Sequence, residues 1–328
     1  MLRRLLICLL AAPTLAAAGA SRLEQCATIP LPGVEGALDH FTIDPRSQRL
    51  FLAARENNTV EIIGLREGRR LQSISGMKRP SGVAYLPRLN WICVANNEDG
   101  TLRLYDAANY QPKQIIPGLE LADNVRYDSE TDRVYVGFGR GALAIVDATQ
   151  AQVAGMIKLA GHPEAFEVRG TNFTSFVNVP DAKQIAVVDL TSRQVSKTWP
   201  MDRFQANFPM AVDPAGQRLF VACRRPARLL ALDWTSGKPI ADVEISGDAD
   251  DLFLDRARQR LYISCGTGVI DVLEPSGESA YQVVERIPTA PGARTSFFSA
   301  DIGLLALAVP RAGQRDAEVR VYQAQAKR

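Results

Sequence analysis

One sequence unit recurs along most of this 328-residue chain and constrains its fold more than any other feature. Each copy has a short apolar strand, a polar turn that often contains Asp, and a second strand of the Arg-Leu-Phe-Val-Ala type. If the second residue of each copy is taken as its anchor, successive anchors lie 41 to 44 residues apart. The seven anchors are Asp44, Leu86, Asp128, Arg169, Asp213, Asp255 and Ser299. A fixed period of this length is typical of propellers and other repeat architectures.

The residues that follow each copy complete a unit of four strands. A third alternating strand comes first, such as 184–190, and a turn and a fourth strand follow, such as 238–246. Four strands in about 42 residues make one propeller blade. The sequence therefore predicts an all-β fold, a seven-bladed β-propeller of four-stranded blades, in a single domain over residues 21–328.

The seventh copy reaches only a third strand, at 319–322. Residues 24–33 precede the first copy and resemble the fourth strands of the other units. We therefore expect this N-terminal strand to join the last blade and close the ring. Closure removes the exposed sheet edges that a linear array would leave.

The first twenty residues have the pattern of a cleaved signal peptide. Arg3 and Arg4 precede an apolar run, and small residues at 18–20 suit a signal peptidase. A retained anchor is the alternative, although Pro13 interrupts the run and the run is short for a membrane span. Cleavage predicts a periplasmic or secreted protein, with no stable membrane span in the mature chain. Removing these two arginines leaves 36 basic and 36 acidic residues, and this balance argues against a nucleic-acid partner.

Four cysteines remain after cleavage, and their spacing matches no zinc site. They are Cys26, Cys93, Cys223 and Cys265. An oxidising compartment permits disulfides, but each cysteine lies in an apolar strand context, so we expect buried free thiols.

The residue nine positions after each anchor is small in six of the seven copies. This column predicts close packing of the blades near the central axis. Asn178 is the exception. It is either a hydrogen-bonded structural residue or part of a site.

The repeat resembles that of the bacterial YVTN-type propellers, the YncE-like group, in the wider neighbourhood of lactonase-type and SMP-30-like propellers. The resemblance rests on the Arg-Leu-Phe-Val-Ala strands and on residues 187–192, and it spans nearly the whole mature chain. The Gly-His and Trp-Asp signatures of WD40 repeats are absent. The resemblance implies a seven-bladed fold and leaves the activity open.

Propellers commonly bind ligands at one mouth of the central channel, on the loops that lead into each innermost strand. The residue five positions before each anchor samples these lead-in loops, and four of the seven are acidic. Together with neighbouring polar residues they give the predicted ligand-binding set, which is Asp39, His40, Arg79, Asp123, Asn124, His162, Glu164, Asn178, Asn207, Asp250 and Arg294. Any one of them could instead cap a turn. As a ring, however, the acids would repel one another unless a cation, an arginine or a ligand offsets their charge.

Two more specific hypotheses concern metal and acid–base chemistry. Glu164, Asn207 and Asp250 are oxygen ligands from three blades, a set that suits Ca²⁺ or Mg²⁺ as a cofactor. The SMP-30-like resemblance implies a divalent ion held by such a set. His40 and His162 are candidate general acids or bases, three blades apart and too far from each other to share an ion.

Two function classes therefore stay open. The first is a monomeric exported propeller that binds a small polar ligand or a periplasmic protein at the channel mouth. The second is a metal-assisted lactonase-type hydrolase or lyase. A purely scaffolding role would leave the acidic ring without a purpose. Carboxylates that converge on an ion would favour the enzyme, whereas a ring neutralised by its own arginines would favour the binding protein.

Overall fold

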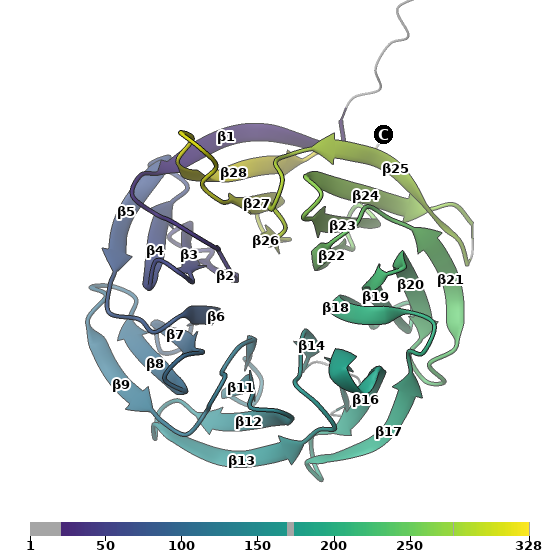
Figure 1. Ribbon diagram of the computed structural model, residues 1–328, viewed down its shortest axis with the longest axis horizontal. Helices are drawn as coiled ribbons and strands as arrows, with labels where there is room; N and C mark the ends of the chain where they lie inside the picture. Colours follow the sequence, from purple (N-terminus) through teal and green to yellow (C-terminus); the bar gives the residue numbers. More distant parts are fainter. Residues whose placement is uncertain (1–20, 169–173, 278, 328) are drawn as a thin grey trace, which may run out of the picture.

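The computed structural model describes residues 21–168, 174–277 and 279–327. Within these ranges the chain forms seven four-stranded antiparallel sheets arranged in a ring around a central opening (Figure 1). This confirms the predicted seven-bladed β-propeller. The predicted signal peptide and the anchor Arg169 lie outside the described residues. No helix in the described part of the chain is long and apolar enough to cross a membrane.

In blades one to six the strands run in chain order from the channel to the rim (Figure 1). Blade one comprises β2 (Phe41–Asp44), β3 (Arg49–Ala54), β4 (Thr59–Gly64) and β5 (Arg69–Ile74). Blade two comprises β6 (Pro80–Leu86), β7 (Trp91–Asn96), β8 (Thr101–Asp106) and β9 (Pro112–Ile116). Blade three comprises β10 (Val125–Asp128), β11 (Arg133–Phe138), β12 (Ala142–Asp147) and β13 (Gln152–Lys158).

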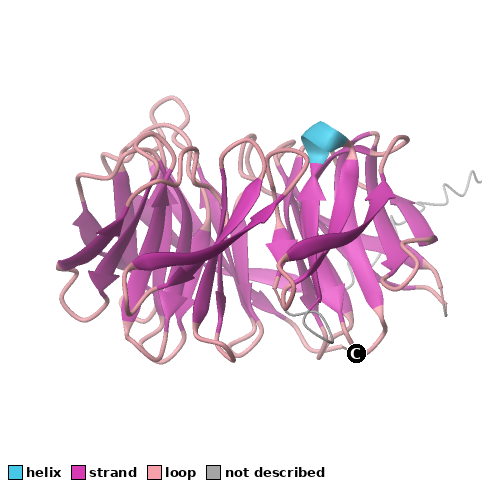
Figure 2. Cartoon of the chain, turned by 90° about the horizontal axis from the view of Figure 1, so that it is seen from below, coloured by secondary structure: helices cyan, strands magenta, loops and turns pink. Residues whose placement is uncertain are grey.

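The remaining blades repeat this order. Blade four comprises β14 (Phe166–Glu167), β15 (Thr174–Val179), β16 (Gln184–Asp189) and β17 (Gln194–Pro200), with a short 3-10 helix, η2 (Pro180–Ala182), between β15 and β16 (Figure 2). Blade five comprises β18 (Gln205–Asp213), β19 (Arg218–Arg225), β20 (Ala227–Asp233) and β21 (Pro239–Glu244). Blade six comprises β22 (Ala249–Asp255), β23 (Arg260–Cys265), β24 (Val269–Pro275) and β25 (Tyr281–Pro288).

Blade seven closes the ring. It contains β26 (Ser296–Ser299), β27 (Leu304–Val309) and β28 (Ala317–Ala324), and its outermost strand is β1 (Leu23–Leu31). β1 pairs antiparallel with β28, from Leu23 opposite Ala324 to Leu31 opposite Ala317 (Figure 1). The predicted closure by the N-terminal strand is therefore confirmed.

The core lies between the faces of neighbouring blades. Seven apolar clusters fill these interfaces, each with side chains from two adjacent blades. The small-residue column is buried as expected, and a Cβ at Gly137 would lie only 3.0 Å from Pro163 Cγ of the next blade. A similar approach occurs at the mouth, where a Cβ at Gly82 would lie 2.0 Å from the backbone oxygen of Asp123. Glycine at position 82 thus lets blades two and three meet there.

All four cysteines in the described residues are free thiols. Cys93, Cys223 and Cys265 are buried, as predicted, and burial raises the pKa of each thiol. The prediction is wrong for Cys26, which is exposed. Cys26 lies in the outermost strand at a register shift between Gln25 and Ala27, where its thiol is exposed and donates to the carbonyl of Val321 at 3.3 Å.

Candidate functional site at the channel mouth

The lead-in loops of six blades surround a cavity of about 270 Å³, which we call the mouth cavity. Its lining is Ala37, Leu38, Asp39, His40, Arg55, Asp123, Asn124, Arg126, Glu164, Ala165, Phe208, Arg224, Asp250, Asp251 and Arg294. Most of these side chains are polar or charged. The lead-in loops thus converge on one site, as their positions in the repeat predicted.

The backbone fixes the acids at the start of the innermost strands. The amide of Asp39 donates to the carbonyl of Ala53 at 2.8 Å, and the amide of Asp123 donates to that of Gly137 at 2.9 Å. The amide of Glu164 makes the same bond to Asn178 at 3.0 Å. Each acid therefore begins the pairing of an innermost strand with the second strand of its blade, and the repeat places all three at the same mouth.

Five carboxylates and four guanidinium groups line the mouth cavity. Arg224 lies 3.1 Å from Asp248 at the rim and pairs closely with Asp250. Arg294 lies 2.9 Å from Asp248 and 3.2 Å from Asp250. The Arg224 guanidinium also lies over the Phe208 ring, 4.1 Å from its centroid. Two arginines therefore neutralise Asp248 and Asp250 of blade six.

Basic groups also accompany the acids of blades one and three. Arg55 lies 3.4 Å from Asp39, and His40 Nε2 lies 3.7 Å from the same carboxylate. His162 Nε2 lies 3.6 Å from Asp123, while its Nδ1 is 2.6 Å from the carbonyl oxygen of Gly139. The interaction with the Asp123 carboxylate raises the pKa of His162 to about 9, despite the opposing effect of burial. His162 is therefore a cation at neutral pH.

Burial shifts the pKa values of several acids upward. It raises the pKa of Glu164 to about 8, with the nearby Asp123 charge adding to the effect. Burial likewise raises the pKa of Asp251 to about 7 and raises the pKa values of Asp39 and Asp250. Asp123 behaves differently, because the interaction with His162 and nearby positive charges outweigh its burial and lower its pKa. The cavity thus holds acids with well-separated proton affinities.

Three charged side chains of the mouth cavity have no ion-pair partner among the described residues. Glu164 has no hydrogen bond or ion pair through its carboxylate there, and Asp251 accepts only a 2.6 Å bond from the backbone amide of Ser296. Arg126 donates to its neighbour's carbonyl at Val125 and lies over the Phe166 ring. In addition, Asn124 is only 2% exposed, and its Oδ1 lacks a hydrogen-bond partner in the described structure.

The structure brings seven of the predicted site residues to this cavity, namely Asp39, His40, Asp123, Asn124, Glu164, Asp250 and Arg294. His162 contacts the cavity only through Asp123. Arg79 is exposed and does not line the cavity. Asn178 and Asn207 are fully buried, and neither lines the cavity.

The two buried asparagines bond to each other and to backbone. Asn178 Nδ2 donates to the carbonyl of Phe208 at 2.9 Å, and its Oδ1 accepts from Asn207 Nδ2 at 2.9 Å. Asn207 Nδ2 also contacts the carbonyl oxygen of Gln184 at 3.2 Å. Of the two roles left open for Asn178, these contacts support the structural one, because they join blade four to blade five.

The predicted metal ligands are only partly brought together. Glu164 and Asp250 line the mouth cavity, and Asn207 does not. In the described ranges no three His, Cys, Asp or Glu side chains form a group suited to a metal ion. Asp250 is instead held by Arg224 and Arg294.

Sequence reasoning missed three of the four arginines in the cavity. Arg55 and Arg224 occupy the same repeat position, at the mouth end of the second strand of blades one and five. Comparing the residues at that repeat position in all seven copies would have found both arginines. Arg126 lies two residues before its anchor, on the innermost strand β10.

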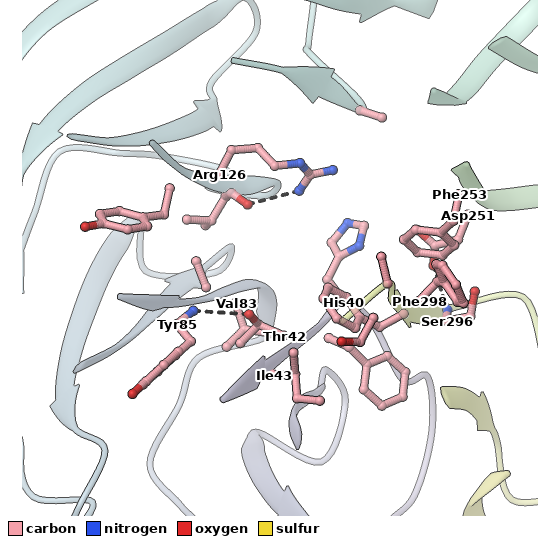
Figure 3. Close-up of a pocket in the computed structure, with 18 of the residues that line it drawn as sticks. His40, Thr42, Ile43, Val83, Tyr85, Arg126, Asp251, Phe253, Ser296 and Phe298 are labelled. Carbon is pink, nitrogen blue, oxygen red and sulfur yellow. Dashed lines mark hydrogen bonds between the residues drawn. The ribbon is translucent and has the colours of Figure 1, made fainter. Parts of the chain in front are cut away.

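A second cavity, of about 600 Å³, continues from the mouth cavity into the central channel, and we call it the channel cavity (Figure 3). The two cavities share His40, Arg126, Ala165 and Asp251. Deeper in the channel the lining includes Thr42, Tyr85 and Phe253. The shared residues therefore form the junction between a charged mouth and a more apolar channel.

Comparisons with known proteins support the fold. No protein-family model matches the chain, and no curated protein sequence matches it. Among solved structures it is similar to Kuenenia stuttgartiensis hydrazine synthase, with a TM-score of 0.74 and 16% identity over 84% of this chain and 94% of that one. It is similar to a chain of a mitotic checkpoint complex, with a TM-score of 0.79 and 13% identity over 98% of each chain. The RRP9 WD40 repeats give a TM-score of 0.78 and 10% identity over 92% of this chain and all of that one. At these identities the likeness establishes a seven-bladed propeller fold and no activity.

Proposed function

We propose that the protein is an exported propeller of the YVTN-type, YncE-like group that binds a small polar ligand in the mouth cavity. The observation that carries this proposal is the pairing of the cavity's acids with the chain's own basic groups. Asp39, Asp123 and Asp250 each have an arginine or a histidine within ion-pair distance. Acids neutralised in this way do not require a metal ion for charge balance.

The shape of the site supports a small ligand over a flat protein interface. The mouth cavity is concave, and convergent polar groups from six blades can fix the orientation of a bound molecule. Asn124 adds a buried amide oxygen whose hydrogen-bonding capacity is unused in the described structure. Such a group costs stability unless a partner satisfies it, and a ligand donor would do so. A periplasmic protein that inserts a polar side chain into the cavity is the other form of the same proposal.

The test is a thermal-shift screen of small polar compounds against the wild-type protein, followed by calorimetric titration of the hits. Glu164→Gln and Arg294→Met change the cavity. Arg256→Met is the matched control, because Arg256 lies in the turn between β22 and β23 and does not line the cavity. We expect hits that bind the wild-type and control proteins and that lose affinity for both cavity variants. Hits that bind all four proteins equally, or a screen without hits, would overturn the proposal.

A further inference from the structure

Among the described residues, the junction between the two cavities holds one arginine and one carboxylate that have no ion-pair partner. Arg126 comes from blade three and Asp251 from blade six, and both line the mouth cavity and the channel cavity. Figure 3 shows the Arg126 and His40 side chains extending into the space between blades, with Asp251 across from Arg126. The other three arginines of the mouth cavity already form ion pairs with aspartates. The junction therefore has opposite charges available to a ligand.

The channel beyond the junction offers an aromatic surface. Phe253 of β22 and Phe297 of β26 contact each other edge to face, with ring centroids 6.1 Å apart, and both line the channel cavity. Both are only half-buried, so one side of the pair remains accessible from the channel. Aromatic rings favour this edge-to-face arrangement, and a third ring can extend it. The channel cavity, of about 600 Å³, lies within the size range of small-molecule sites.

Resting on the proposed function, we infer that the ligand is a zwitterionic amino compound with an aromatic side chain. Its carboxylate bonds to the Arg126 guanidinium, its ammonium group faces Asp251 and Glu164, and its ring lies against Phe253 and Phe297. A planar guanidinium suits a carboxylate because it can donate two parallel hydrogen bonds.

Two acids fit the ammonium end of such a ligand, Asp251 at the junction and Glu164 in the adjoining mouth cavity. Asp251 keeps only one backbone hydrogen bond, and Glu164 has no partner within the described ranges. Burial raises the pKa values of both carboxyls, and a nearby cation would favour their charged forms.

The test is calorimetric titration of the full chain with three probes of one shape. L-phenylalanine carries both charges, phenylalaninamide lacks the carboxylate, and N-acetylphenylalanine lacks the ammonium group. We expect phenylalanine to bind about tenfold or more tightly than either analogue, because each loses one charge-assisted hydrogen-bonding group. Equal binding of all three probes, or no binding of phenylalanine at millimolar concentration, would overturn the inference.

Two variants assign each end of the ligand. Arg126→Gln should remove the preference for phenylalanine over phenylalaninamide and keep its preference over N-acetylphenylalanine. Asp251→Asn should do the reverse, and it preserves an oxygen for the backbone amide of Ser296. Preferences that survive both substitutions would contradict the assignment. Phenylalanine could fail to bind while compounds from the polar screen still bind the wild-type protein and lose affinity for Arg294→Met. In that case the inference is wrong and the proposed function stands.

Discussion

Arg224 neutralises much of the acidic charge of blade six. The loss of unfolding free energy in Arg224→Met therefore reports how much this charge balance contributes to stability. The substitution keeps an apolar stem over Phe208 and removes the contacts to Asp248, Asp250 and the carbonyl of Ala249. Arg224 and Asp250 are 19% and 25% exposed, so the pair is mostly shielded from water. Charge-assisted hydrogen bonds contribute about 1.5–3 kcal/mol when buried and exposed ion pairs about 0–1 kcal/mol. We therefore expect Arg224→Met to lower the free energy of unfolding by about 2 kcal/mol at neutral pH.

The pH dependence of this loss follows from Asp250. Burial raises the pKa of Asp250 while Arg224 and Arg294 lower it, so removing Arg224 raises that pKa further. In Arg224→Met, the loss of unfolding free energy is present at a pH where Asp250 is ionised. It disappears as the pH falls and the Asp250 carboxyl gains a proton. Urea unfolding at about pH 8 and about pH 4 should therefore show a larger destabilisation at the higher pH.

Two controls separate this effect from general damage. Arg256→Met removes an exposed contact to Asp213 at 3.7 Å and should cost less than about 1 kcal/mol. Combining Arg224→Met with Asp250→Asn should recover part of the loss, because the unpaired charge is gone. A destabilisation below about 0.5 kcal/mol at neutral pH, or one of equal size at both pH values, would refute the idea that Arg224 neutralises this site.

Three further predictions concern ring closure, acid burial and cysteine reactivity. Ile29→Ala should lower the free energy of unfolding, measured by urea titration, by about 2–5 kcal/mol, because Ile29 is only 1% exposed in the closing strand. The control is Thr28→Ala, which should have little effect because the neighbouring Thr28 is exposed. Because the pKa of Glu164 is about 8 in the folded protein and lower in the unfolded chain, ionisation of this group destabilises the wild-type fold between about pH 5 and pH 9. The free energy of unfolding of Glu164→Gln should therefore rise by more than about 1 kcal/mol relative to that of the wild type over that range. A stability difference that does not change with pH would contradict this. Iodoacetamide followed by mass spectrometry should label Cys26 and leave Cys93 unmodified in the folded protein, and labelling of both at one rate would contradict their different exposure.

The repeat made the fold predictable because each copy carries the same strand and turn pattern. An anchor at a fixed period fixes the blade number, and the resemblance of residues 24–33 to the other outer strands was enough to predict closure. Local departures from the repeat could not be predicted in this way. The register shift beside Cys26 is one such departure, and the thiol at that point is exposed.

The candidate site was predictable in part, for the same reason. The acids of the lead-in loops share one position in the repeat, so their convergence followed from the fold. Arg55 and Arg224 lie at the end of the second strand of their blades, where the chain has returned to the mouth. Arg79 shows the opposite error, since it adjoins a lead-in loop in sequence but has a positive φ of 51° and an exposed side chain outside the cavity. The direction of a single side chain depends on local backbone geometry, which a column of residue types does not contain.

The buried asparagines illustrate a further limit. Asn178 and Asn207 are polar residues in positions that sequence reasoning associates with a channel mouth. Their mutual hydrogen bond, with oxygen and nitrogen 2.9 Å apart, depends on the contact between blades four and five. Only the relative placement of two blades shows that the Asn207 amide group donates to the Asn178 oxygen, and this placement is a tertiary property.

Elemental analysis of the purified protein, with its melting temperature recorded with and without a chelator, tests the central claim most directly. That claim is that Asp39, Asp123 and Asp250 of the mouth cavity are paired with the chain's own basic groups and so need no metal ion. We expect no stoichiometric divalent ion and no change in melting temperature on chelation. One Ca²⁺ or Mg²⁺ ion per chain, with melting lowered by the chelator, would contradict the claim and favour the metal-assisted lactonase-type alternative.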